Sequence, residues 1–152
     1  MSLIVVSLER KNLCYRSFYK LCEIFLDEIS AGNISNLGSF QSKRQALLDT
    51  MDTLETLINS ELASLSPERK LELQGTNELG STIQTLLREK DSIVNSILIV
   101  DKEILRALDR IKDDTLQKIH SIQSGRRTVH KYKSSIDTIE RAEGLKIVDD
   151  EV

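Results

Sequence analysis

The sequence is poor in the residues that shape turns and pockets. It has no tryptophan, one proline and six glycines, and its aromatic residues are three tyrosines and three phenylalanines. Enzymes of the α/β class use glycine and proline in turns and aromatic side chains in pockets, so this composition disfavours such an enzyme. The abundant residues are leucine, isoleucine, serine, lysine and glutamate, which is typical of elongated helices.

Cysteine is also scarce, with only Cys14 and Cys22. On one helix this spacing places the two sulfur-bearing residues roughly 12 Å apart, which is too far for a disulfide. We therefore expect both to be reduced, buried, small hydrophobic residues of a cytoplasmic protein.

Long apolar runs are absent, so we expect no membrane insertion, since a transmembrane helix needs about 20 such residues. The apolar start from Leu3 to Leu8 precedes its charges, which is the reverse of a secretory signal. The net charge of −3 disfavours nucleic acid as the partner, because proteins that bind it concentrate positive charge.

Signatures of catalysis are missing as well. The two histidines, His120 and His130, lie far from both cysteines, so no zinc spacing is present. No Glu-x-x-His pair, glycine-rich phosphate loop or nucleophile elbow occurs. We predict that the protein is not an enzyme and needs no metal or cofactor.

The dominant positive feature is a row of apolar residues at alternating three- and four-residue steps from Leu79 to Ile111. No proline or glycine interrupts residues 81–124, so the pattern predicts a long helix over 77–124, roughly 70 Å in length. Asp113-Asp114 is a point where this helix could break. Gly125 costs about 1 kcal/mol in a helix relative to alanine, and we expect it to be a joint before a C-terminal helix over 126–142 and a mobile tail over 143–152.

Three further helices are predicted before the long one. Apolar stripes predict helices over 7–31 and 34–64, separated by Gly32 as a stop and Asn33 as a cap. Ser66 and Pro67 start a short helix over 67–74. The fold expected is a single all-α domain over 1–152: an elongated antiparallel bundle in which a helical hairpin packs on a long third helix, with a C-terminal fourth helix.

A basic cluster lies near the end of the chain, because residues 115–136 contain no acidic residue. Its charged members are Lys118, Arg126, Arg127, Lys131 and Lys133. Three interpretations stay open: a solvated helix end favoured by the helix dipole, phosphate binding by Arg126, Arg127 and Lys131, or docking onto an acidic protein.

The stretch from Leu26 to Ile58 resembles the first helical hairpin of bacterial flagellar export chaperones. The residues that carry the resemblance are Ala31-Gly32-Asn33 at the turn, then Lys43-Arg44 and Leu47-Leu48. The stretch from Ile97 to Lys133 is similar to the last part of the FliT-type chaperones, where an aspartate-led helix ends in a glycine and two basic residues before a tyrosine. Here these are Asp101, Gly125, Arg126, Arg127 and Tyr132. FlgN-type relatives have a similar organisation.

The resemblance implies a small cytoplasmic chaperone. It would hold the C-terminal segment of an axial flagellar subunit, the filament-cap protein for the FliT type or a hook-associated protein, prevent its premature assembly and deliver it to the export ATPase and export gate. The resemblance also implies a last helix that covers the client groove and a tyrosine, here Tyr132, that contacts the export gate. The candidates for the covering helix and this contact are Arg126, Arg127, Val129, Tyr132, Ile136 and Ile139.

Such a groove should be apolar, so that it can accept a client helix. The candidates for it are Met51, Leu54, Ile58, Ile93, Ile97, Val100 and Ile104. The alternative for each of these residues is plain bundle core.

Other functions stay open beside the chaperone. Heptad-like steps along the long helix also fit a structural coiled-coil homodimer without a client. A regulator that acts by protein contact is another alternative, as is nucleic-acid binding through the basic cluster.

Overall fold

The structure is a computed structural model that describes the backbone of residues 2–150 and the side chains of residues 2–136. This part of the chain forms four helices: α1 (Leu3–Ser30), α2 (Leu37–Ser64), α3 (Pro67–Gln74) and α4 (Glu78–Asp150). No strand occurs among the described residues, so the all-α class is confirmed. We expected one domain, but the contacts divide the chain into two units, Met1–Leu108 and Asp109–Val152.

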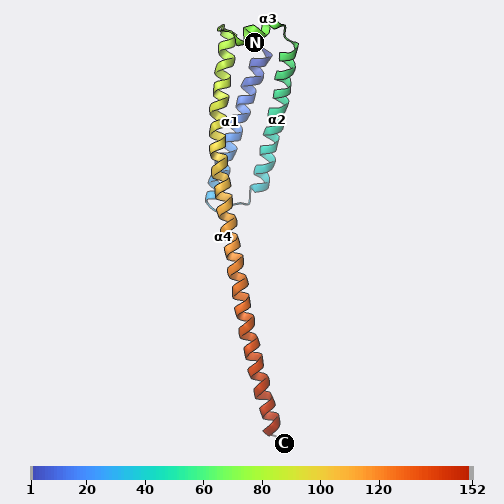
Figure 1. Cartoon of the computed structure of the whole chain (residues 1–152), viewed down its shortest axis with the longest axis vertical. Coiled ribbons are helices and arrows are strands. Elements are labelled where there is room, and N and C mark those ends of the chain that lie inside the picture. The colour runs from blue at the N-terminus through green and yellow to red at the C-terminus, as the bar shows by residue number, and fades with distance from the viewer. Residues whose placement is uncertain (1, 151–152) are drawn as a thin grey trace. The chain divides into compact units, whose positions relative to one another are not determined.

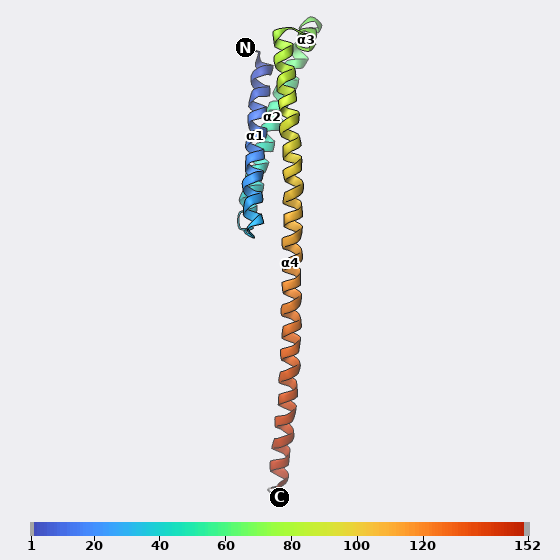
Figure 2. The ribbon, with the colours of Figure 1, turned by 90° about the vertical axis from the view of Figure 1, so that its left-hand side faces the viewer.

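In the first unit, α1 and α2 form an antiparallel hairpin that packs beside the first part of α4 (Figures 1 and 2). This part of α4, residues 78–108, runs in the same direction as α1 and opposite to α2. The short α3 crosses the end of the bundle where α1 begins (Figure 1). The predicted hairpin on a long helix is thus confirmed for this unit.

The core of the first unit is aliphatic over most of its length. Its buried apolar members are Ile4, Val5, Phe18, Cys22, Phe25, Ile29, Phe40, Met51, Leu54, Ile58, Ile83, Ile97, Val100, Ile104 and Ala107. The rings of Phe25 and Phe40 stack between α1 and α2, with centroids 4.0 Å apart and planes 8° apart. At the other end, Ile4 and Val5 pack with Ile83, which explains why α1 begins at Leu3 and not at Ser7 as expected.

The loops between helices follow the expected local chemistry with one correction. Gly32 has φ +82°, a left-handed conformation that favours glycine at the end of a helix. Asn33 does not cap α2, which begins only at Leu37; its side-chain Oδ1 instead accepts a hydrogen bond from the Ser35 backbone N–H at 3.0 Å. This turn holds residues 34–36 outside the helix.

Side chains cap the next two helices, and the predicted start of the short helix at Ser66-Pro67 is confirmed. The Ser66 hydroxyl accepts from the Arg69 backbone N–H at 3.4 Å at the start of α3, and Pro67 is the first helical residue. Asn77 Oδ1 accepts from the Gly80 backbone N–H at 2.8 Å at the start of α4. Each side chain satisfies an N–H that has no partner inside its own helix.

The predicted joint at Gly125 is wrong, because α4 is helical from Glu78 to Asp150. Asp113-Asp114 does not break it either, and residues 143–150 are part of the helix and not a separate tail. A single glycine costs only about 1 kcal/mol, which the flanking helix formers can offset. The division between units falls after Leu108 instead.

None of the helices in the described part of the chain combines the length and the hydropathy that crossing a membrane requires.

Candidate functional site

The residues predicted to line a client groove lie mostly in the core of the first unit. Met51, Leu54 and Ile58 of α2 and Ile97, Val100 and Ile104 of α4 are buried, and Ile93 is half-buried. Helical periodicity identified their face correctly, but that face is covered by the neighbouring helices. Ile58 also lines a hollow of about 550 Å³ in the first unit, whereas the other candidates form bundle core, so they do not line one continuous groove as expected.

Exposed apolar side chains occur in both units. In the first unit they include Leu71, Ile99 and Leu105, while in the second unit no described side chain is buried. From Lys112 to Ile136 every described side chain is exposed, including Val129 at 55 % and Tyr132 at 69 %. Five apolar residues share one side of the helix: Ile119, Ile122, Val129, Tyr132 and Ile136. Leu116 is also exposed but lies roughly 120° around the helix from Ile122.

Basic side chains lie among these apolar residues. Lys118, Arg126 and Lys133 fall on the same side of the helix as Ile122 and Val129. We call these eight residues the C-terminal face: Lys118, Ile119, Ile122, Arg126, Val129, Tyr132, Lys133 and Ile136.

The charges of the C-terminal face have no ion-pair partner among the described residues. Residues 115–136 contain no carboxylate, and the nearest ones along the sequence are Asp114, four residues before Lys118, and Asp137, four residues after Lys133. The face therefore combines exposed apolar surface with positive charges that form no ion pair among the described residues, a combination suited to an amphipathic partner.

The residues predicted to form the covering helix lie on two different sides of α4. Val129, Tyr132, Ile136 and Arg126 belong to the C-terminal face, while Arg127 lies on the opposite side of α4. Ile139 lies outside the described side chains. They belong to α4 itself and do not form a separate helix after Gly125.

The first unit contains a concave surface, located where α1 begins and α2 ends. This hollow of about 550 Å³ is walled by aliphatic residues of α1, α2, α3 and α4. Its only charged lining residue is Lys70. Gln74 and Gln84 are its other polar lining residues, so the hollow is mostly but not entirely apolar.

A bidentate ion pair links α2 to α4. Arg44 donates two hydrogen bonds to Asp101, Nη1 to Oδ1 and Nη2 to Oδ2, both at 3.0 Å. Its guanidinium carbon lies 5.0 Å from the Phe18 ring centroid. The guanidinium head of Arg44 is half-buried and paired.

The buried thiol beside this pair is chemically quiet. Burial, with Asp101 as the next cause, raises the pKa of Cys22 from 9.0 to about 11, against a lowering effect of Arg44. Because the thiolate is the reactive form, Cys22 is not a nucleophile near neutral pH. The expectation of a buried small hydrophobic residue is confirmed for Cys22, whereas Cys14 is half-buried.

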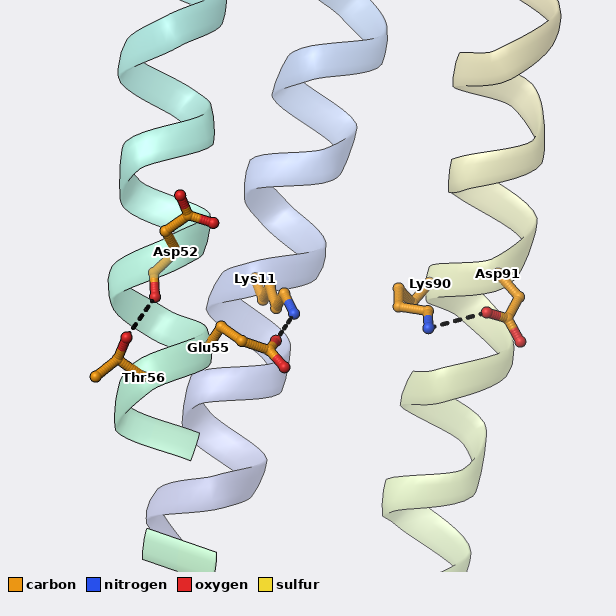
Figure 3. Close-up of polar contacts among 6 residues, drawn as sticks. All are labelled: Lys11, Asp52, Glu55, Thr56, Lys90 and Asp91. Carbon is orange, nitrogen blue, oxygen red and sulfur yellow. Dashed lines mark hydrogen bonds and ion pairs between the residues drawn. The ribbon is translucent and has the colours of Figure 1, made fainter. Parts of the chain in front are cut away.

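The other polar contacts lie between or within helices and do not converge on a site among the described residues. Lys11 of α1 pairs with Glu55 of α2, and Lys90 pairs with its neighbour Asp91 at 3.1 Å (Figure 3). The buried Asn12 side chain donates to the Leu86 carbonyl at 3.0 Å, joining α1 to α4. Among the described residues, no group of three or more His, Cys, Asp or Glu side chains could hold a metal ion.

Comparison with protein-family models, with curated proteins and with solved structures finds no match to this chain.

Proposed function

We propose that the protein is an export chaperone that binds the C-terminal segment of an axial flagellar subunit, with the filament-cap protein as the first candidate and a hook-associated protein as the next. The observation that carries the proposal is the C-terminal face. A monomer seldom leaves a row of apolar side chains in water unless a partner covers it. The sequence resemblance to FliT-type chaperones gives the partner its class.

Binding would place a helix of the client along α4. Such a helix presents anchors at i, i+3, i+4 and i+7, which is the spacing of the C-terminal face itself. Burying the exposed parts of about five apolar side chains contributes on the order of 5 kcal/mol before rim charges are added and the ordering of the client is subtracted. This apolar contribution alone corresponds to a Kd of roughly 0.1–1 mM, so the complex would be weak and reversible.

Capture of this segment would keep the subunit from assembling early in the cytoplasm. The chaperone would then bring its client to the export ATPase and the export gate of the flagellar type III apparatus. Tyr132 is the residue proposed for the gate contact, and its phenol is the most exposed aromatic side chain of the described chain. A client bound over Tyr132 would block this contact, so client release and gate contact would be coupled.

The test is a calorimetric titration with the C-terminal segment of the filament-cap protein encoded in the same genome. The full chain should bind, and the double variant Ile122→Asp/Val129→Asp should not, because two charges would enter the covered surface. Leu116→Asp is the matched control, since Leu116 is equally exposed on another side of the helix. Loss of binding in this control, or no binding by any axial-subunit terminus, would refute the proposal.

Truncation after Ser124 separates two forms of the mechanism. If the end of α4 covers a groove elsewhere, the truncated chain should bind the client more tightly. If the C-terminal face is the binding surface, truncation removes Val129, Tyr132 and Ile136 and should abolish binding. The second result is the one expected from their exposure.

A structural coiled-coil homodimer is the second candidate function. It is favoured by Ile122, Val129 and Ile136, which recur every seven residues as in a coiled-coil seam. Sedimentation equilibrium of the free chain distinguishes the homodimer from the chaperone. A tight dimer that the Ile122→Asp/Val129→Asp substitutions dissociate would favour the structural homodimer over the chaperone. A regulator that acts by protein contact would bind a transcription factor in place of an axial subunit in the same titration.

A further inference from the structure

We infer that the partner of the C-terminal face is an amphipathic helix with acidic residues along one flank and a large apolar side chain at its centre. This inference rests on the proposed function, because it describes the helix that would lie on the same face. It selects the third interpretation of the basic cluster, an acidic protein partner, over phosphate binding.

The charges of the face set the first requirement. In a heptad register with Ile122, Val129 and Ile136 at position a, Arg126 and Lys133 occupy successive e positions beside the seam. Both are exposed and neither has an ion-pair partner among the described residues. A partner helix with carboxylates at the facing positions would neutralise this flank, whereas a basic helix would be repelled.

The other flank is uncharged and compact. Thr128 and Ser135 occupy g positions, and their hydroxyls donate to the Ser124 and Lys131 carbonyls of their own helix at 3.0 and 3.1 Å. These side chains are small and already have hydrogen-bond partners. Charged residues therefore flank the seam on one side only. A partner helix with carboxylates on one flank would bind in the orientation that brings this flank next to them.

A second copy of this chain meets the requirement poorly. In a parallel pair, Arg126 and Lys133 would face Ser121 and Thr128 of the other copy, and no ion pair would form. Lys118 would face its own equivalent at a d position. In an antiparallel pair centred on Val129, Arg126 would face Lys133, so like charges would meet.

Gly125 sets the size of the central side chain. It occupies the d position between Ile122 and Val129, and a Cβ added there would meet nothing within 4 Å. Its φ is not positive and no neighbour approaches it, so neither a turn nor close packing within the described chain requires glycine. The missing side chain leaves a notch in the seam that a leucine or an aromatic ring of a partner would fill.

The probes are helical peptides of about three heptads with leucine at a and d, a central phenylalanine at d, and one of three flanks. The flank positions carry glutamate, glutamine or lysine in otherwise matched sequences. Binding to the full chain is measured by fluorescence anisotropy, at peptide concentrations where sedimentation shows the peptides to be monomeric. The glutamate peptide should bind about tenfold more tightly than the glutamine peptide, and the lysine peptide should be weakest.

Charge reversal gives the decisive comparison. Arg126→Glu/Lys133→Glu should invert the order, so that the lysine peptide binds best. Arg127→Glu/Lys131→Glu is the matched control, because it changes the net charge equally on the opposite side of α4 and should keep the original order. Gly125→Leu should weaken the phenylalanine-centred peptide about tenfold but spare a peptide with alanine at that position.

Three outcomes overturn the inference: no preference among the flanks, an equal effect of both charge reversals, or no binding of any peptide. The first two leave the export chaperone proposal standing, because the axial-subunit segment could still bind through apolar contacts alone. The titration with the subunit segment tests the export chaperone proposal independently of these peptides. If the glutamate peptide binds best but no axial-subunit terminus binds, the inference of an acidic helical partner stands. That partner would then come from a protein other than an axial subunit.

Discussion

Breaking the ion pair between Arg44 and Asp101 should loosen the packing of α2 on α4. The pair is bidentate, with both oxygen–nitrogen distances at 3.0 Å, and the guanidinium also lies over Phe18 at 5.0 Å and Phe40 at 6.0 Å. The contact joins residues 57 positions apart in the sequence, so it is made only in the folded unit.

Its magnitude follows from geometry and exposure. The two side chains are 33 % and 27 % exposed, so water screens part of the attraction, while two parallel hydrogen bonds strengthen it. We expect a coupling free energy of about 1 kcal/mol between the two residues. Asp101→Asn alone should cost about 2 kcal/mol, because the guanidinium stays half-buried with a weaker acceptor.

The assay is a double-mutant cycle in urea with Arg44→Met, which keeps much of the apolar stem, and Asp101→Asn, which keeps the volume. The matched comparison is the cycle for Arg16 and Glu89, a single contact at 3.3 Å whose side chains are 55 % and 44 % exposed. That cycle should give less than about 0.5 kcal/mol. A coupling for Arg44 and Asp101 no larger than this control would refute the reasoning.

Three further predictions concern stability and the thiol. Gly80→Ala should destabilise the first unit by about 1–3 kcal/mol, because the new Cβ would lie 2.1 Å from the Gly75 carbonyl oxygen. Gly125→Ala, by contrast, should raise the helicity measured by circular dichroism and stabilise the helix by up to about 1 kcal/mol. Ile104→Ala should cost about 2–5 kcal/mol in chemical unfolding, since Ile104 is 3 % exposed; a cost below 1 kcal/mol would contradict its place in the core. Burial raises the pKa of Cys22 to about 11 from 9.0, so the folded state holds this proton longer than the unfolded state and the stability contribution present below pH 9 should be lost as the pH rises toward about 11. Urea unfolding of the wild type and Cys22→Ala across this range measures it, and parallel pH profiles would contradict the shift.

Much of the fold could be predicted from the sequence because its local signals are strong. The apolar steps of the hairpin and of residues 79–111 predicted the helices and their shared core. Ser66-Pro67 predicted the start of α3 at the observed residue. These signals act over a few residues, where one side chain satisfies one backbone group or faces one neighbour.

The ends and interruptions of helices were harder to predict, because small free energies decide them. Gly125 suggested a joint, yet its cost in a helix is about 1 kcal/mol and α4 continues through it. Asn33 looked like a cap for α2, but its side chain closes a turn before the helix begins. The pairing of Arg44 with Asp101 was missed for another reason, since no local pattern links residues 57 positions apart.

The candidate site shows what periodicity cannot decide alone. The same spacing marks the buried row from Ile97 to Ala107 and the exposed row from Ile119 to Ile136, so the pattern does not tell covered from uncovered surface. The lengths of the helices explain why one row is covered and the other is not. Helices α1 and α2 have 28 residues each, which corresponds to about 42 Å and matches residues 78–108 of α4.

Charge then distinguishes the two rows of α4. In the covered part, acidic and basic residues alternate, and Asp101 pairs with the hairpin. In the exposed part, residues 115–136 carry no acidic residue, although a solvated helix is usually more stable when both signs are interspersed. An acidic helix would cover the apolar side chains of this row and neutralise its positive charges together, and this is the argument for such a helix as the proposed partner.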